Sequence, residues 1–271
     1  LQVGIECFGG SDIAKEDAKL FSIISKAVGF TDLKIVTGDL GVLRSAINGL
    51  EINQRCKNAL LRQLWRPKRF LHVLKYFSNS IHFINNEKKE IIDLFKSGKL
   101  IEKINSYNST IGLRTRKDII ERVSELSNDI VNNQLQENDV KLLQNLLKIS
   151  CTLVDAPKNI KKLTYSHDYL KKAAILLENR LDNLSELGIN VKQIDFEVSF
   201  GRTSMEYYDG FVFEMGPKKQ INSIPFAQGG RYNELTKILS RLQGYHKSTN
   251  SVGGIIRPEI LHNFKLNQGI K

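Results

Sequence analysis

Two stretches decide the fold of this chain: YYDGFVFE at residues 207–214 and GGRYN at residues 229–233. Each brings a tyrosine, Tyr208 or Tyr232, next to a segment that reads as a strand. Two tyrosine rings can enclose a flat side chain, because each offers an apolar face and one hydroxyl. The paired glycines of the second stretch let the main chain approach a ligand that a Cβ would block. The two stretches therefore predict an amino-acid pocket on a sheet.

Composition indicates a globular chain without a metal site. Its 271 residues, 41% of them apolar, are enough for one large domain or for a domain with an insertion. The sequence has neither an 18-residue apolar run nor a leader of the signal-peptide type, so we expect a cytoplasmic location and no membrane. Cys7, Cys56 and Cys151 lie far apart without a CxxC motif, and the histidines share no ligand spacing. We expect no metal and no cofactor.

A net charge of +11 makes nucleic acid a partner to consider. The cations are spread along helical segments rather than gathered, so nucleic acid is not the expected partner, and an RNA-binding module stays an alternative. One denser patch surrounds Trp65, and it fits an acidic protein partner or a phosphate. Its cations are Arg62, Arg66, Lys68 and Arg69.

The first fifty residues read as the start of an α/β sheet. Alternating apolar residues predict a strand over residues 2–8, and three- and four-residue steps predict a helix over residues 12–28. A short strand over residues 33–37 and a helix over residues 40–50 follow.

From residue 51 to residue 188 the sequence favours helices. Leucine-rich amphipathic segments predict helices over residues 60–77, 88–106, 140–151 and 170–187, the last of them ended by Gly188. Thr115 and Asp118 have the spacing of a capping box, which predicts a helix start.

From Val191 onward alternation returns. It predicts successive strands at residues 194–198, 208–213, 221–226 and 252–256. Short connections with glycine between successive strands favour an antiparallel sheet of the α+β class.

These motifs resemble the histidine-binding motifs of class II histidyl-tRNA synthetases and of a related family, the regulatory subunits of ATP phosphoribosyltransferase. Residues 1–6, LQVGIE, resemble the second half of motif 2, although the motif's arginine would precede Leu1. Residues 251–259 resemble motif 3, with Arg257 at the place of its arginine. The resemblance spans nearly the whole chain and implies a class II core, an antiparallel sheet flanked by helices.

The resemblance also implies a domain division. Residues 1–50 and 189–271 would form the two parts of the synthetase-like core, and residues 51–188 a helical segment inserted between them. The motif 1 portion, which supplies the dimer interface in class II proteins, is expected to lie outside this chain.

The resemblance assigns roles to individual residues. Gln2 would hold backbone groups of a bound histidine, and Glu6 would accept a hydrogen bond from its imidazole ring. Tyr208 and Tyr232 would line the pocket. Gly229 and Gly230 would supply its main-chain wall. Tyr207 is expected on the opposite face of the strand, packed against a helix.

Arg202 does not fit the pattern. The families place an arginine four residues before the tyrosine pair, but Thr203 occupies that position and Arg202 stands one residue earlier. A one-residue shift turns a strand side chain to the other face, so either a bulge restores Arg202 or its role in histidine binding is lost.

Several departures argue against a working synthetase. Ile256 stands where a synthetase has a glutamate before the motif 3 arginine, and only a short stretch follows Arg257 where an anticodon-binding domain would be needed. We therefore expect no catalytic residues. The expected function is that of a regulatory subunit which joins the short catalytic subunit of ATP phosphoribosyltransferase, pairs with a second copy and conveys feedback inhibition by histidine. A truncated histidyl-tRNA synthetase is the alternative.

Overall fold

The structure is a computed structural model, in which two compact units are distinguished. It describes residues 1–29, 33–78, 86–106, 115–132, 135–164, 167–202, 206–218, 224–244 and 249–267. The first unit comprises residues 1–50, 64–67 and 141–271 and holds the sheet. The second comprises residues 51–63 and 68–140 and is helical within its described part. The predicted domain boundaries at residues 50 and 188 stay a prediction.

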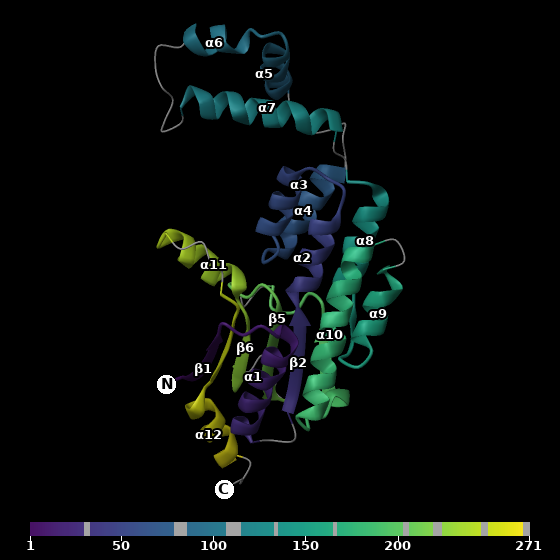
Figure 1. Cartoon of the computed structure of the whole chain (residues 1–271), viewed down its shortest axis with the longest axis vertical. Helices are drawn as coiled ribbons and strands as arrows, with labels where there is room; N and C mark the ends of the chain where they lie inside the picture. Colours follow the sequence, from purple (N-terminus) through teal and green to yellow (C-terminus); the bar gives the residue numbers. More distant parts are fainter. Residues whose placement is uncertain are drawn as a thin grey trace. The chain divides into compact units, whose positions relative to one another are not determined.

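The described residues form one seven-stranded sheet in the order β1-β7-β6-β5-β2-β4-β3 (Figure 1). The strands are β1 (Val3–Phe8), β2 (Leu33–Asp39), β3 (Ser150–Thr152), β4 (Ile194–Glu197), β5 (Phe211–Pro217), β6 (Ala227–Arg231) and β7 (Ser251–Ile256). All neighbours pair antiparallel except β2 and β4, which are parallel. The α+β class is thus confirmed, with one parallel pair that the sequence did not predict.

Helices flank the sheet and build the second unit. Those that lie wholly in the first unit are α1 (Ile13–Val28), α2 (Leu40–Gly49), α9 (Ala156–Lys162), α10 (Asp168–Glu186), α11 (Asn233–Leu242) and α12 (Pro258–Asn267). The others are α3 (Gln54–Arg62), α4 (Pro67–Ser78), α5 (Asn86–Lys96), α6 (Leu100–Ser106), α7 (Arg116–Asn132) and α8 (Glu137–Leu147).

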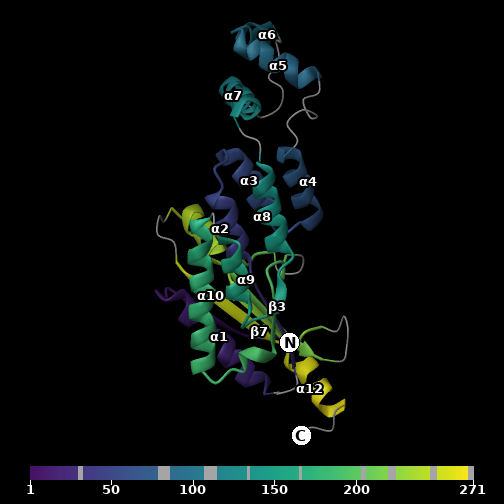
Figure 2. The same ribbon diagram turned by 90° about the vertical axis from the view of Figure 1, so that its right-hand side faces the viewer.

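One face of the sheet is covered by α1 and α10, which lie side by side in both ribbon views (Figures 1 and 2). Phe21 of α1 meets Phe213 of β5 with their ring centroids 5.1 Å apart. Ile24 of α1 lies directly over Gly254 of β7, where a Cβ would come within 2.5 Å of its Cδ1. The apolar stripe of α1, predicted from its periodicity, thus forms the core of this unit.

A buried ionic network lies under the same helices. Arg180 of α10 donates from Nε to Asp17 of α1 at 2.9 Å and from Nη1 to Asp39 of β2 at 2.8 Å. Arg231 of β6 donates from Nε to Asp17 at 2.8 Å. Full burial raises the pKa of Asp17, and the Arg180 and Arg231 guanidinium groups act against that shift. The guanidinium carbon of Arg180 lies 4.6 Å from the ring centre of Phe211, a cation–π contact.

Several predicted elements are confirmed in detail. The capping box is formed as expected, since the Thr115 backbone N donates to Asp118 Oδ2 at 2.8 Å and the Asp118 backbone N donates to Thr115 Oγ1 at 3.2 Å. Gly188 follows the end of α10 with a φ of +79°, a conformation that favours glycine. Asp12 caps α1 by accepting from the backbone N of Lys15.

Two predicted helices prove to be pairs of helices. The helix predicted over residues 60–77 is divided into α3 and α4, because Pro67 begins α4 and disfavours a helical residue before it. The helix predicted over residues 88–106 is divided into α5 and α6 at Gly98, whose φ is +74°. Periodic apolar residues continue across both breaks, so the pattern alone did not reveal them.

One predicted helix end and one predicted strand were wrong. The helix predicted to reach residue 151 ends at Leu147, and Ser150–Thr152 form β3 against β4 instead. A three-residue strand is too short for alternation to reveal it. In the strand predicted over residues 221–226, Ile221 lies outside the described residues, and the observed strand, β6, begins at Ala227. Its Gly229–Gly230 pair carries no side chains that could alternate.

Candidate binding site on the tyrosine face

Four of the predicted pocket residues, Glu6, Tyr208, Gly230 and Tyr232, lie on the face of the sheet that α1 does not cover. Directly paired residues share a face, and Glu6, Gly253, Gly230 and Val212 form one row across β1, β7, β6 and β5. The two glycines leave the main chain bare between the Glu6 carboxylate and the Val212 side chain. We call this surface, with the tyrosines beside it, the tyrosine face.

The predicted tyrosines meet there. Tyr208 and Tyr232 are both buried, and their ring centroids are 6.2 Å apart. They pack with Val212 and Phe200 in one apolar cluster. Phe8 of β1 meets Tyr232 edge to face at 6.3 Å. The structure therefore brings together two aromatic side chains that lie 24 positions apart in the sequence.

Tyr207 is a correction to the sequence analysis. Its ring lies 4.1 Å from that of Tyr208, and its hydroxyl donates to the Tyr208 hydroxyl at 2.7 Å. It is 50% exposed and is not buried behind the sheet. Residues 206–210 precede β5 as turn and loop, so the alternation of a strand does not apply to them. Tyr207 is a residue of the tyrosine face that sequence reasoning missed.

Glu6 and Tyr232 interact directly, since the Tyr232 hydroxyl donates to Glu6 Oε2. Burial raises the pKa of Tyr232 well above its usual range, and the Glu6 carboxylate adds to that shift. Burial also raises the pKa of Tyr208, and the hydrogen bond from Tyr207 adds to it. Both phenols are therefore neutral donors at physiological pH.

Gly229 and Gly230 serve internal packing. A Cβ on Gly230 would lie 2.5 Å from the Phe211 carbonyl oxygen and 2.9 Å from the Tyr208 ring. A Cβ on Gly229 would lie 2.6 Å from the Phe213 ring. These glycines let one aromatic ring lie against each face of β6, which fixes the position of Tyr208.

Arg202 and Gln2 lie in different surroundings. Arg202 is buried, and its Nε donates to the carbonyl oxygen of Leu64 at 2.5 Å. Burial lowers the pKa of its guanidinium to about 10. Gln2 is exposed just before β1 and is one of the residues predicted to hold histidine. Their roles in histidine binding stay predictions, as does the register of Arg202, because Thr203 lies outside the described residues.

A second row of the tyrosine face carries polar groups. Gly4, Ile255, Gln228 and Glu214 are successive partners across β1, β7, β6 and β5. Burial raises the pKa of Glu214, while the positive charges of Arg257 and Lys34 oppose that shift. Arg257, the predicted motif 3 arginine, donates from Nη1 to the carbonyl oxygen of Pro225 at 2.9 Å.

The arrangement suits a flat cationic or amphoteric ligand. Glu6 accepts from Tyr232 and has further lone pairs for a ring N–H or an ammonium group. The exposed ring of Tyr207 offers an apolar face beside it. A charge-assisted bond to Glu6 combined with stacking on Tyr207 would select an imidazole or a comparable ring over an aliphatic side chain.

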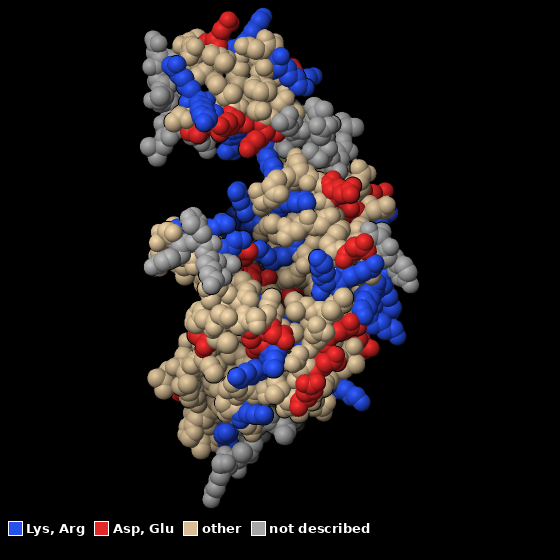
Figure 3. Space-filling model, in the orientation of Figure 1, with Lys and Arg blue, Asp and Glu red and all other residues tan. Residues whose placement is uncertain are grey.

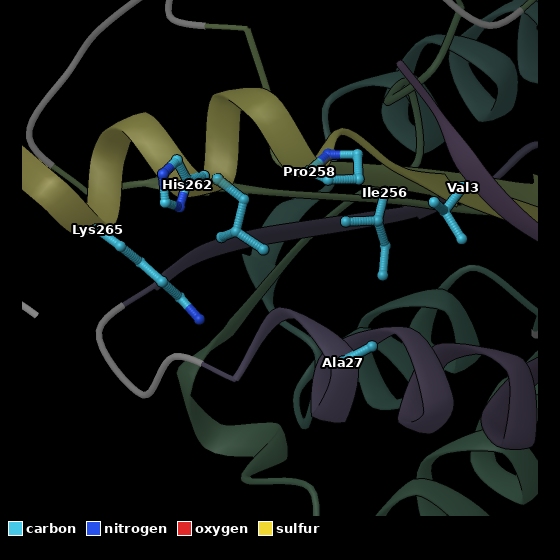
Figure 4. A pocket seen from close by; sticks show the side chains of 7 residues that line it. Val3, Ala27, Ile256, Pro258, His262 and Lys265 are labelled. Carbon is cyan, nitrogen blue, oxygen red and sulfur yellow. The ribbon is translucent and has the colours of Figure 1, made fainter. Parts of the chain in front are cut away.

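A cavity of about 310 Å³ lies on the other side of the sheet, away from these residues (Figure 4). The side chains of Val3 and Ile256 point into it from β1 and β7, with Ala27 of α1 and the residues of α12 around them. Its remaining lining residues are Pro258, Leu261, His262 and Lys265. None of the predicted pocket residues contributes to this cavity.

Metal clusters and membrane-spanning helices are both absent from the described part of the chain. There, no three side chains of His, Cys, Asp or Glu come together as a metal site would require. No helix in the same residues has the length and apolar character needed to span a bilayer.

Two further residues support the tyrosine face and were not predicted. Trp65 donates from Nε1 to the carbonyl oxygen of Tyr208 at 3.0 Å. Asp209 accepts from the backbone N of Glu234, close to Tyr232. Trp65 stood out in the sequence only as the centre of a basic patch, and Asp209 only as part of the YYDG stretch. The sequence did not indicate that Trp65 contacts Tyr208 or that Asp209 contacts Glu234, because the partners are far apart in the chain.

The fold is that of class II histidyl-tRNA synthetases. The structure of histidyl-tRNA synthetase from Nostoc sp. PCC 7120 matches all of this chain with a TM-score of 0.57 at 16% identity. A protein from Bacillus halodurans, described as an ATP phosphoribosyltransferase regulatory subunit/histidyl-tRNA synthetase, matches 96% of it with a TM-score of 0.55 at 18% identity. The chain spans 51% and 52% of these two structures.

Two curated relatives carry the same name. The sequence is 26% identical over 258 residues to a protein of Brucella anthropi named ATP phosphoribosyltransferase regulatory subunit. It is 26% identical over 255 residues to the protein of the same name from Brucella canis. Each match covers 88% of this chain and 66% of the relative. No family model matches the sequence. The resemblance stated from the motifs is therefore confirmed by similarity to these proteins.

Proposed function

We propose that this chain is a non-catalytic regulatory subunit of ATP phosphoribosyltransferase that binds histidine on the tyrosine face. The observation that carries the proposal is the contact between Glu6 and Tyr232, which places a carboxylate within a cluster of tyrosines. The name shared by the Brucella relatives supports the same function. In this proposal the chain acts in the cytoplasm, in the first step of histidine biosynthesis.

The proposed partners are the short catalytic subunit, a second copy of this chain and histidine as effector. Feedback inhibition requires only that histidine binds the inhibited assembly more tightly than the active one. A coupling of about 1–3 kcal/mol between the two sites is typical and would be enough.

Two residues favour regulation over amino-acid activation. Arg202, the candidate for stabilising carboxylate or phosphate charge, lies buried against the Leu64 carbonyl. Ile256 occupies the position before Arg257 where a synthetase carries an acid. Because the fold is that of histidyl-tRNA synthetases, synthetase activity is the competing proposal.

The test is phosphoribosyl-ATP formation by the short catalytic subunit, with and without this chain, across a histidine titration. We expect activation that histidine reverses. Tyr232→Phe keeps the ring but removes the hydroxyl bonded to Glu6, so the reversal should require more histidine. No activation, together with histidine-dependent exchange of pyrophosphate into ATP, would assign the chain to the synthetases instead.

A further inference from the structure

Helix α11 carries an apolar stripe that stays exposed in the described part of the first unit. Its apolar residues recur at positions i, i+3, i+4 and i+7, on one side of the helix, and the helix contains no buried residue. They are Leu235, Ile238, Leu239 and Leu242, with exposures of 36%, 52%, 50% and 78%. By contrast, α1 buries Phe21 and Ile24 completely or nearly so. A stripe of this kind marks an interaction surface.

The charges around the stripe identify its occupant. Glu234, the one acidic residue of α11, is already paired with Arg44 at 3.1 Å and Lys237 at 3.7 Å. Arg241 in the last turn is exposed and has no ion pair among the described residues. Figure 3 shows Lys and Arg atoms in blue on this face of the molecule. The cations of α11, Lys237 and Arg241, outnumber its one acidic residue, so the stripe is complementary to an acidic surface.

A second copy of the chain fits this surface poorly. Lys237 and Arg241 beside the stripe would lie near the same cations of a second copy, which disfavours pairing at α11. A different protein with an apolar, acid-rimmed surface avoids this repulsion.

The first turn of α11 is joined to the tyrosine face. Tyr232 directly precedes the helix, and Asp209, which follows Tyr208, accepts from the backbone N of Glu234. The backbone N of Asp209 donates to the carbonyl oxygen of Arg231 at 2.8 Å. A movement of either tyrosine on ligand binding therefore acts on the start of α11.

We propose that the apolar stripe of α11 is the docking surface for an acidic partner protein, and that Asp209 makes docking respond to a ligand on the tyrosine face. The inference rests on the proposed function, in which that partner is the short catalytic subunit. It adds the surface that binds the partner and the residue that couples this surface to histidine.

The docking part is tested by the dissociation constant of the complex with the short catalytic subunit. Leu239→Glu should weaken the complex at least tenfold, because it places a charge in an apolar contact. The variant should still bind histidine as wild type does, since Leu239 faces solvent. Ile175→Glu on α10 is the matched control, with 49% exposure, and should leave the complex unchanged.

The possible failures are distinguishable. If the wild type activates the catalytic subunit and Leu239→Glu binds it equally well, the docking surface is wrong while the proposed function stands. If Leu239→Glu instead turns a dimer of this chain into a monomer by light scattering, a second copy occupies α11 and the inference is overturned. If the wild type neither binds nor activates the catalytic subunit, both the proposed function and the inference fail.

The coupling part uses Asp209. In the wild type, histidine should change the dissociation constant of the complex severalfold. Asp209→Ala removes the acceptor for Glu234 N and should abolish that change, while Asp209→Asn keeps an acceptor oxygen and should preserve it. A full histidine response in Asp209→Ala would overturn the coupling.

Discussion

Arg231 and Tyr232 are consecutive residues that serve the two faces of one sheet. Arg231 is directed to the helix-covered face, where Asp17 bonds it at 2.7 and 2.8 Å. Tyr232 lies on the tyrosine face, where it bonds Glu6 beside the half-exposed Tyr207. The covered face joins α1, α10 and β6 through fully buried charges. The tyrosine face presents hydroxyls, a carboxylate and bare glycine main chain.

This difference indicates a division of labour. On the covered face each charge has a buried partner, so removing one leaves another uncompensated in the core. On the tyrosine face Glu6 is exposed, so changing it should alter binding more than folding. Four substitutions test this division.

The largest expected effect is that of Asp17→Ala. The substitution leaves Arg180 and Arg231 without the carboxylate that both of them bond, so we expect a loss of about 3–5 kcal/mol in the free energy of unfolding. Urea unfolding of the two proteins measures it. Glu178→Ala breaks an exposed pair with Lys161 and should change stability by less than about 1 kcal/mol. Equal losses in the two variants would contradict a special role for the network.

Gly230→Ala tests the link between the faces and should have the next largest effect. The new Cβ would meet the Phe211 carbonyl oxygen at 2.5 Å, so backbone must shift, and we expect a loss of about 1–3 kcal/mol. Histidine binding should weaken as well, because the Tyr208 ring lies against Gly230. The control is Gly216→Ala on β5, whose Cβ would have an ordinary contact at 3.8 Å from Pro225.

Glu6→Gln addresses the tyrosine face alone. Replacing a charged acceptor by a neutral one should weaken histidine binding about tenfold, or about 1.4 kcal/mol, with little change in stability because Glu6 is exposed. Calorimetric titration with histidine measures the affinity, and urea unfolding measures the stability. Glu259→Gln, at an exposed carboxylate of α12, should bind histidine as wild type does. A Glu6→Gln protein with unchanged affinity would remove Glu6 from the site.

The smallest effect concerns pH. Burial raises the pKa of Glu214 above its ordinary 4.5, so the folded protein binds more protons than the unfolded chain once the pH exceeds 4.5. Its contribution to stability is complete below that pH and is lost as the pH rises through the raised pKa. Because Glu214 is only half-buried, the amount should stay below about 1 kcal/mol. Glu214→Gln should therefore gain stability relative to wild type across this window, and parallel pH curves would contradict this.

The sequence predicted the core of the first unit well, because α1 and α10 carry regular apolar stripes and β2 and β5 have clear strand patterns. The strand β1 was predicted as half-buried, but Val3 and Ile5 are exposed. The sequence also identified Tyr208 and Tyr232, which the structure brings together, and Glu6, which bonds Tyr232. These predictions came from the short motifs at residues 1–6, 207–214 and 229–233, in which the informative residues are close together in the sequence. Their binding roles stay predictions.

Other features depend on contacts between distant segments. In the buried network, Asp17 bonds Arg180, which lies 163 positions away, and Arg231, which lies 214 positions away. No local sequence pattern indicates these contacts. Tyr207 was placed on the wrong face because its segment is not a strand. The α11 stripe follows the helical period, but only the structure reveals that it is exposed.

The most direct test of the account is calorimetric titration of the wild-type chain with free histidine, alongside Tyr232→Phe. The account predicts one saturable site per chain and weaker binding in the variant, because the hydroxyl that orients Glu6 is lost. Absence of binding at millimolar histidine, or equal affinity in the two proteins, would contradict a histidine site on the tyrosine face.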